Sequence, residues 1–280
     1  MKILFIGGGN MCQAIVGGLI AQGMAAREVH VIEPVAEARE ALARLGVSSA
    51  AAVEPADLAA TVIVLAVKPQ AMKIAIAPLA GRLNSQLVVS IAAGIQCREL
   101  SAWLGTDSRA YANLVRAMPN TPALIRAGIS GLFAMPGVSA DDRQAAENLL
   151  GAVGETAWFA QESMLDAVTA VSGSGPAYVF YFIEALEQAA VDLGFEPAVA
   201  RMFALQTFLG GARLAAGSAD SPDVLRQRVT SRRGTTERAI ETFDALELKQ
   251  QIVRGVKAAC ERSRELGEEM RLAAADGGQA

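Results

Sequence analysis

KILFIGGGNMC, residues 2–12, carries the strongest fold signal in the chain. Lys2–Ile6 predicts a buried β-strand, and Asn10–Gln22 predicts the helix that follows it. The glycines between them match the G-x-G-x-x-G/A pattern at Gly7 and Gly9. Gly7 permits the tight turn and Gly9 lets the backbone approach a pyrophosphate, while the start of the helix offers free N–H groups. This strand–turn–helix unit predicts a dinucleotide-binding site.

The third small position of the pattern, normally glycine or alanine, is Cys12. Cysteine is still small enough for helix and sheet to pack closely. The expected dinucleotide contacts in this stretch belong to the turn and its two flanks. They are Ile6, Gly7, Gly8, Gly9, Asn10 and Met11. A glycine-rich turn without a ligand is the alternative interpretation.

Outward from this unit, the first 160 residues alternate short apolar runs with alanine-rich helical stretches. Val62–Val67 and Leu87–Ile91 are uninterrupted aliphatic runs, typical of strands that are buried on both faces of a parallel sheet. Further strands are expected at 29–33, 115–118, 130–135 and 156–159, and a further helix at 36–45. Right-handed crossovers between such elements give a doubly wound parallel sheet of the Rossmann type.

The pattern changes after about Ala160, where strand-like runs give way to long helical segments. Helices are expected at 177–193, 198–216 and 246–266. Each is followed by a glycine, at 194, 217 and 267, that suits a helix C-terminus. The sequence therefore predicts an α/β protein of two domains. Residues 1–160 form a dinucleotide-binding domain, and residues 161–280 form an all-helical domain.

Composition narrows the classes of function. The 280 residues carry a net charge of −4 and a single histidine, His30, which excludes a histidine-rich site and predicts no bound metal. Three widely spaced cysteines without a CxxC pair indicate a reducing, cytoplasmic location rather than a disulfide framework. The acidic balance and the lack of a long uncharged apolar run argue against nucleic acid and membrane as partners.

Glu33 ends the predicted second strand, where an acidic side chain usually accepts hydrogen bonds from the adenosine ribose. Its charge would repel a 2′-phosphate and so favours NADH over NADPH, whereas Arg39 is close enough in sequence to attract that phosphate. A solvated strand-end carboxylate is the alternative. Glu33 and the adjacent Pro34 are expected cofactor residues, and the expected cofactor is NADPH or NADH.

Four further segments carry a resemblance to a known family. They are LAVKPQ at 65–70, MPNTP at 118–122, SGSGPAY at 172–178 and VTSRRGTTE at 229–237. Together with the glycine turn, they make nearly the whole chain resemble the pyrroline-5-carboxylate reductase family, the last enzymes of proline biosynthesis. The family usually has V-T-S-P-G-G-T-T or V-T-S-K-G-G-T-T in the last segment. Arginines at 232 and 233 replace the usual residues, so the conformation of this turn does not follow from the resemblance.

The resemblance implies reduction of a cyclic imino acid, (S)-1-pyrroline-5-carboxylate, to L-proline by NADPH or NADH. It places the loop after the strand 62–67, with Ala66, Val67, Lys68 and Pro69, beside the nicotinamide half of the cofactor. The loop after the next strand, with Ala92 and Ala93, is also expected to face the cofactor. Glu162 is expected near the substrate, with a solvated carboxylate as the alternative. A homo-oligomer is also implied, an interlocked dimer that can assemble into a decamer, and the apolar character of 168–193 and 198–214 on more than one helix face fits it.

The residues of the last segment, 229–237, also suggest how a small anion could be bound. Gly234 can end a tight turn before a helix, which leaves the N–H groups of Thr235 and Thr236 without helical partners. With the Ser231 hydroxyl, these groups can hold a small carboxylate, and an N-capping cluster without a ligand is the alternative. The resemblance implies that this loop binds the substrate carboxylate and that the Thr236 hydroxyl bonds the ring nitrogen. Thr236 and Ser231 are the expected catalytic residues.

The few possible proton donors in the sequence suit reduction of an imine better than reduction of a carbonyl. Carbonyl reduction needs a proton donor, often His or Lys, yet His30 is the only histidine and no lysine lies between Lys73 and Lys249. An imine nitrogen can be protonated before the hydride arrives, so hydroxyl groups suffice to orient it. Two alternatives remain: another imine or 3-hydroxyacid reductase of the same architecture, and a non-catalytic dinucleotide-binding sensor.

Overall fold

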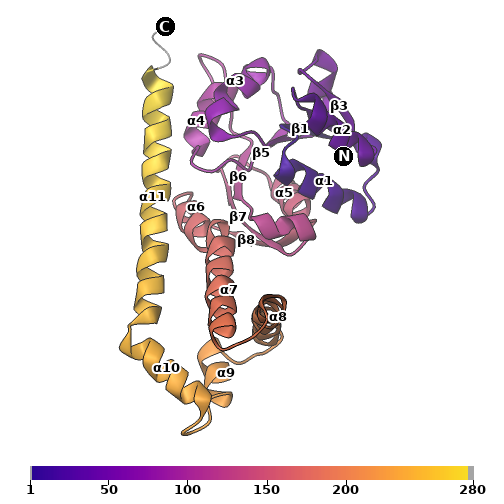
Figure 1. Ribbon diagram of the computed structural model, residues 1–280. Coiled ribbons are helices and arrows are strands. Elements are labelled where there is room, and N and C mark those ends of the chain that lie inside the picture. The colour runs from indigo at the N-terminus through magenta and orange to yellow at the C-terminus, as the bar shows by residue number, and fades with distance from the viewer. Residues whose placement is uncertain (1, 277–280) are drawn as a thin grey trace. The chain divides into compact units, whose positions relative to one another are not determined.

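The computed structural model describes residues 2–276, with side chains up to residue 272. The chain divides into two compact units (Figure 1). The first runs from the N-terminal strand to Ser174 and includes the chain from Ala259 onward. The second is Gly175–Ala258.

An eight-stranded sheet forms the centre of the first unit, in the order β3-β2-β1-β4-β5-β6-β7-β8. The strands are β1 Ile3–Ile6, β2 Val29–Ile32, β3 Ser48–Ala50, β4 Val62–Leu65, β5 Leu87–Ser90, β6 Leu114–Met118, β7 Gly128–Ala134 and β8 Gly154–Trp158. The first six strands are parallel and stand in the order 3-2-1-4-5-6, which is that of the dinucleotide-binding Rossmann fold. The predicted doubly wound sheet is therefore confirmed.

Helices cover both faces of this sheet. The α-helices of the first unit are α1 Asn10–Ala21, α2 Ala36–Arg44, α3 Met72–Ile76, α4 Cys97–Leu104, α5 Ala140–Gly151 and α6 Met164–Val168. Short 3₁₀ helices span Ala26–Glu28, Pro55–Ala59, Pro69–Ala71, Ala77–Leu79 and Thr121–Ile125, and a π-helical turn spans Thr169–Gly173. Side chains of β1 alternate between two cores: Ile3 and Phe5 join one apolar cluster, Leu4 and Ile6 the other. Both faces are thus buried, which explains the uninterrupted apolar runs.

One strand pairing differs from the parallel sheet that the sequence predicts, because β7 runs antiparallel to β6. Residues 119–127 connect the two strands, and this segment is too short for the crossover that a parallel pair needs. The chain turns back through the 3₁₀ helix Thr121–Ile125, whose C-cap, Arg126, has a left-handed φ of 58°. A crossover through α5 then places β8 parallel to β7. The short strand β3, of sequence SSA, lacks the apolar pattern by which the other strands are predicted.

The second unit is all-helical, as the sequence predicts. It holds α7 Gly175–Asp192, α8 Pro197–Ala216, α9 Pro222–Arg228, α10 Thr235–Ala245 and the first part of α11, Leu248–Asp276. Gly194, with φ 96°, follows the end of α7, and Gly217 caps α8. No helix within residues 2–276 combines the length and apolar character that a membrane crossing requires.

The prediction that Gly267 ends the last helix is wrong, because α11 continues to Asp276. An added Cβ at Gly267 would lie 3.2 Å from the carbonyl oxygen of Gly94. The glycine therefore serves a close approach between α11 and the loop after β5, not a helix end. The SGSGP motif at 172–176 spans the end of the π-helical turn Thr169–Gly173 and the start of α7.

Candidate functional site

The glycine turn between β1 and α1 has the geometry that its sequence predicts. Gly7 adopts φ 100°, and its N–H donates to the Ile32 carbonyl at 2.8 Å. A Cβ at Gly7 would lie 2.7 Å from the carbonyl oxygen of Ala66, so this position admits only glycine. A Cβ at Gly9 would meet no atom within 4 Å. No protein atom therefore fills the space beside the Gly9 Cα, and a ligand can occupy that space.

The N-terminus of α1 is suited to an anion. Gly9 is its N-cap, and no side chain within residues 2–276 caps it. The first turn carries no acidic side chain, so its free N–H groups and the positive end of the helix dipole remain available to a pyrophosphate. Cys12 is fully buried, and burial, with the Glu33 charge as a second cause, raises the pKa of its thiol well above the ordinary value. It therefore packs as a small apolar residue.

Glu33 fixes the end of β2 to the glycine turn. Its Oε2 accepts a hydrogen bond from the Gly8 N–H at 2.7 Å, and its Oε1 accepts one from the Val35 N–H at 2.9 Å. Arg39 Nη1 donates to the carbonyls of Glu33 and Pro34, both at 2.8 Å. The guanidinium is thus held beside the strand end at which Rossmann proteins recognise the adenosine ribose.

The other expected cofactor residues lie at the same edge of the sheet. Ala66, Val67, Lys68 and Pro69 follow β4, and the Ala66 N–H donates to the Ile6 carbonyl at 2.8 Å. Ala92 and Ala93 follow the neighbouring strand β5. Because β1, β2, β4 and β5 are parallel, their carboxyl ends meet at one edge, where dinucleotides bind in this fold. The expected cofactor residues are therefore brought together.

Glu162 is joined to two groups of the same unit. Its Oε1 accepts hydrogen bonds from Arg116 Nη1 at 3.0 Å and from the Cys97 N–H at 2.7 Å. Arg116 lies in β6 and is only 4% exposed. Sequence reasoning did not single out Arg116, although an arginine inside the apolar run LVRAM was the available signal.

The MPNTP and SGSGP motifs are connected through Asn120. This residue is 9% exposed; its Nδ2 donates to the Ser172 carbonyl at 3.1 Å and its Oδ1 accepts from the Ile129 N–H at 2.9 Å. A Cβ at Gly173 would lie 2.7 Å from the terminal methyl of Met118. The motifs thus shape the π-helical turn before α7, and π-helical turns are frequent at functional sites.

The expected substrate residues of the second unit surround the start of α10. Gly234 is its N-cap, its N–H donates to the Ser231 carbonyl at 3.0 Å, and no side chain of the described residues caps the helix. The first N–H groups of α10, which include those of Thr235 and Thr236, therefore remain available to an anion. Ser231 lies against Gly234, where an added Cβ would be 2.3 Å from the serine Oγ. Ser231, Gly234, Thr235 and Thr236 therefore lie together at the start of α10, and this group of four residues is termed the cradle.

Arg233, which replaces a glycine usual in the family, adopts a left-handed φ of 61°. Its N–H donates to Glu237 Oε2 at 2.5 Å, so the turn forms despite the arginine. A left-handed conformation costs a non-glycine residue about 1–2 kcal/mol.

Replacing Arg233 by glycine would remove this cost, although the greater freedom of glycine in the unfolded chain offsets part of the stabilisation. We expect Arg233→Gly to stabilise the protein by about 0.5–1 kcal/mol, measured by urea unfolding. The same gain from Arg232→Gly, at a position without positive φ, would contradict this explanation.

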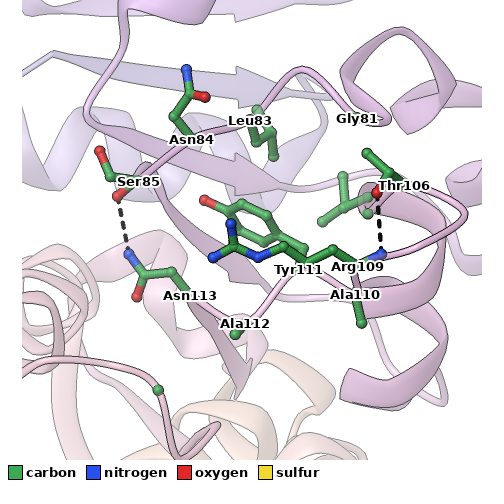
Figure 2. Close-up of a pocket in the computed structure, with 13 residues that line it drawn as sticks. Gly81, Leu83, Asn84, Ser85, Thr106, Arg109, Ala110, Tyr111, Ala112 and Asn113 are labelled. Carbon is green, nitrogen blue, oxygen red and sulfur yellow. Dashed lines mark hydrogen bonds between the residues drawn. The ribbon is translucent and has the colours of Figure 1, made fainter.

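A cavity of about 530 Å³ lies elsewhere in the first unit (Figure 2). It is lined mainly by residues that precede β5 and β6, including Leu83, Ser85, Arg109 and Tyr111, and by Gly137 after β7. Its lining contains none of the expected site residues. Burial, with the nearby Asp142 charge as a second cause, raises the pKa of Tyr111 to about 12, and its hydroxyl donates to the Gln86 carbonyl. This cavity is at the amino ends of the strands, opposite the glycine turn.

The fold and the site define a class. A six-stranded Rossmann core with an open glycine turn, followed by a helical region, is typical of a nicotinamide-dinucleotide oxidoreductase. In agreement, residues 2–94 match a family described as NADP oxidoreductase, coenzyme F420-dependent. Residues 162–266 match the family described as pyrroline-5-carboxylate reductase dimerisation.

Relatives cover almost the whole chain. The pyrroline-5-carboxylate reductase of Pseudomonas aeruginosa is 46% identical over 96% of this chain and 98% of its own length. The structure of the Coxiella burnetii pyrroline-5-carboxylate reductase superposes with a TM-score of 0.88, at 40% identity over 95% of this chain and 98% of that one. A Plasmodium falciparum pyrroline carboxylate reductase solved with NADP bound gives a TM-score of 0.83, at 26% identity over the same shares of the two chains. The chain belongs to the pyrroline-5-carboxylate reductase family.

Proposed function

We propose that this protein reduces (S)-1-pyrroline-5-carboxylate to L-proline with NADPH. The observation that carries this proposal is the pairing of two anion sites in one chain: the uncapped start of α1 behind the glycine turn, and the uncapped start of α10 behind Ser231. The first fits a pyrophosphate and the second a small carboxylate. Family membership supports the choice of a cyclic imino acid as the substrate.

The dinucleotide, when bound, supplies a hydride to the ring carbon of the C=N bond. We assign its phosphates to the turn Gly7–Gly9 and to the N–H groups of Asn10 and Met11. The loops Ala66–Pro69 and Ala92–Ala93 would contact its nicotinamide half. The cradle residues bind the substrate carboxylate through N–H groups and the Ser231 hydroxyl. The Thr236 hydroxyl orients the ring nitrogen, and we propose Glu162 as a further substrate-binding residue.

The choice between NADPH and NADH depends on the end of β2. The negative charge of Glu33 by itself favours NADH, but both of its carboxylate oxygens already accept backbone hydrogen bonds. The Arg39 guanidinium is held beside it and can pair with a 2′-phosphate. Steady-state kinetics with pyrroline-5-carboxylate and each cofactor test the proposal. Turnover with NADPH is expected, and oxidation of neither cofactor by this imine would refute the function.

We further propose that residues 1–160 and 161–280 act as dinucleotide-binding and substrate-binding domains, and that the second domain forms a homodimer that can assemble further. Exposed apolar side chains on α7 and α8 support this oligomer. Phe180 is 60% and Tyr181 70% exposed, and Met202 and Phe203 lie more than half exposed on α8. Three widely spaced cysteines, two of them buried, support a cytoplasmic location.

The dimer proposal has a direct test. Burying these apolar faces against a second copy removes them from water, which is favourable by about 25 cal/mol per Å². Sedimentation equilibrium at micromolar concentration should therefore give a mass of at least two chains. An active species with the mass of one chain would contradict it.

A further inference from the structure

The loop that follows β5, residues 91–95, lies at the carboxyl edge of the sheet and makes few hydrogen bonds. Among the described residues, the N–H groups of Ala93, Gly94 and Ile95 donate to no protein acceptor. A segment with few backbone hydrogen bonds is held mainly by packing, and it opens more easily where that packing is lost. The conformation of this loop therefore depends on what packs against it.

The last part of α11 supplies this packing. An added Cβ at Gly94, which has φ 79°, would lie 3.1 Å from the Met270 sulfur and 3.2 Å from its terminal methyl. An added Cβ at Gly267 would lie 3.2 Å from the Gly94 carbonyl oxygen. Met270 also packs against the apolar cluster that contains Ala92 and Ile95. Loop and helix thus meet through two glycines and one methionine, and a further side chain between them would be crowded.

This part of α11 belongs to the same compact unit as the loop. The unit includes the chain from Ala259 onward. The Ser263 hydroxyl donates to Asp166 Oδ1 at 2.8 Å, and Arg98 of α4 attracts Glu268 of α11. The contact between the helix and the loop therefore lies wholly within the first unit.

The position of the loop in the sheet relates it to one half of a dinucleotide. Glu33 and Arg39 lie at the end of β2, where this fold recognises the adenosine ribose. From there the strands follow in the order β2-β1-β4-β5. A dinucleotide lies across the carboxyl edge of such a sheet, between its two halves. A cofactor with its adenosine at β2 therefore extends its nicotinamide toward β4 and β5, where Ala92 and Ala93 lie.

We propose that Met270 and Gly267 are positioning residues, which hold the loop 91–95 in the conformation that receives the nicotinamide half of NADPH. This inference rests on the proposed function. A loop that also samples open conformations binds its ligand more weakly, in proportion to the fraction of molecules that are competent to bind. Met270 and Gly267 raise this fraction by packing against the loop, and they touch no cofactor atom in this proposal.

The test is isothermal titration calorimetry on the full-length protein with two ligands, NADPH and 2′-phospho-ADP-ribose, which lacks the nicotinamide. Met270→Ala removes the side chain behind the loop and should raise the Kd for NADPH at least about fivefold. The Kd for 2′-phospho-ADP-ribose should stay within about twofold, because the glycine turn and the end of β2 are unchanged. A role in stability alone would not separate the two ligands.

Gly267→Val perturbs the same contact by adding atoms instead of removing them. Its Cβ would lie 3.2 Å from the Gly94 carbonyl oxygen, so the loop must shift. NADPH binding should again weaken at least about fivefold, with little effect on 2′-phospho-ADP-ribose. The matched control is Leu272→Ala on the same helix, where the side chain is 51% exposed, and both Kd values should stay within about twofold. If Met270→Ala does not fold, Gly267→Val is compared with this control alone.

Unchanged NADPH affinity in the two loop-facing variants would overturn the inference, as would equal weakening of the two ligands. Either result leaves the proposed function standing. If the unchanged protein does not bind NADPH, the function and the inference are both refuted. NADPH binding without turnover of pyrroline-5-carboxylate would refute the proposed reaction, and the inference with it.

Discussion

Gly9→Val should weaken NADPH binding by at least about 100-fold, equivalent to about 2.7 kcal/mol, without lowering the Tm. The Cβ of a side chain at this position would meet no protein atom within 4 Å, so the fold tolerates it. The same side chain would occupy the space through which the backbone approaches the pyrophosphate. Quenching of protein fluorescence by NADPH measures the binding, and thermal unfolding measures the stability.

Two other glycines supply the controls. Gly17 lies in the same helix and also has open space around an added Cβ, so Gly17→Val should leave NADPH binding unchanged. Gly7→Val should instead destabilise the fold, because Gly7 has φ 100° and its Cβ would lie 2.7 Å from the Ala66 carbonyl oxygen. NADPH affinity that survives in Gly9→Val would show that the pyrophosphate does not bind at this turn.

Thr236→Ala should lower kcat/KM for pyrroline-5-carboxylate about 5- to 150-fold, the range that corresponds to losing a hydrogen bond of about 1–3 kcal/mol. Among the described residues the Thr236 hydroxyl has no hydrogen-bond partner, so the fold does not depend on it. The loss should appear with the imine as the varied substrate, while the Kd for NADPH stays the same. Initial rates at several concentrations of each substrate separate the two effects.

Thr242→Ala is the matched control on the same helix. Its hydroxyl donates to the Arg238 carbonyl at 3.0 Å and lies on the exposed side of α10. Removing it should leave kcat/KM within about twofold. A Thr236→Ala enzyme as active as this control would exclude Thr236 from the reaction and leave the cradle to its N–H groups alone.

The Rossmann core could be predicted from the sequence because its signals are local. A glycine turn, a buried strand before it and a helix after it occupy residues 2–22, and tertiary structure did not alter them. The position of Glu33 at the end of β2 followed from the same periodicity. The hydrogen bond from the Gly8 N–H to the Glu33 carboxylate could not be predicted in this way, because it joins residues 25 positions apart.

The unpredicted features depend on contacts between distant segments. Gly267 resembles a helix end in the sequence, but the helix continues because the glycine meets the loop at Gly94. Arg116 lies in β6 and Glu162 in the turn between β8 and α6, so their ion pair joins residues 46 positions apart in the sequence. The left-handed conformation of Arg233 is set by the turn around it, not by its residue type.

One helix, α11, contributes to both compact units, and this limits how the chain can be divided. Its part beyond Ala259 belongs with the sheet, where the Ser263 hydroxyl donates to Asp166 Oδ1 at 2.8 Å and the Met270 sulfur would lie 3.1 Å from a Cβ at Gly94. A protein cut after Ser174 would keep every strand yet lose the support behind the loop that follows β5. The first compact unit is therefore not contiguous in the sequence, and an isolated version of it needs the chain from Ala259 onward as well.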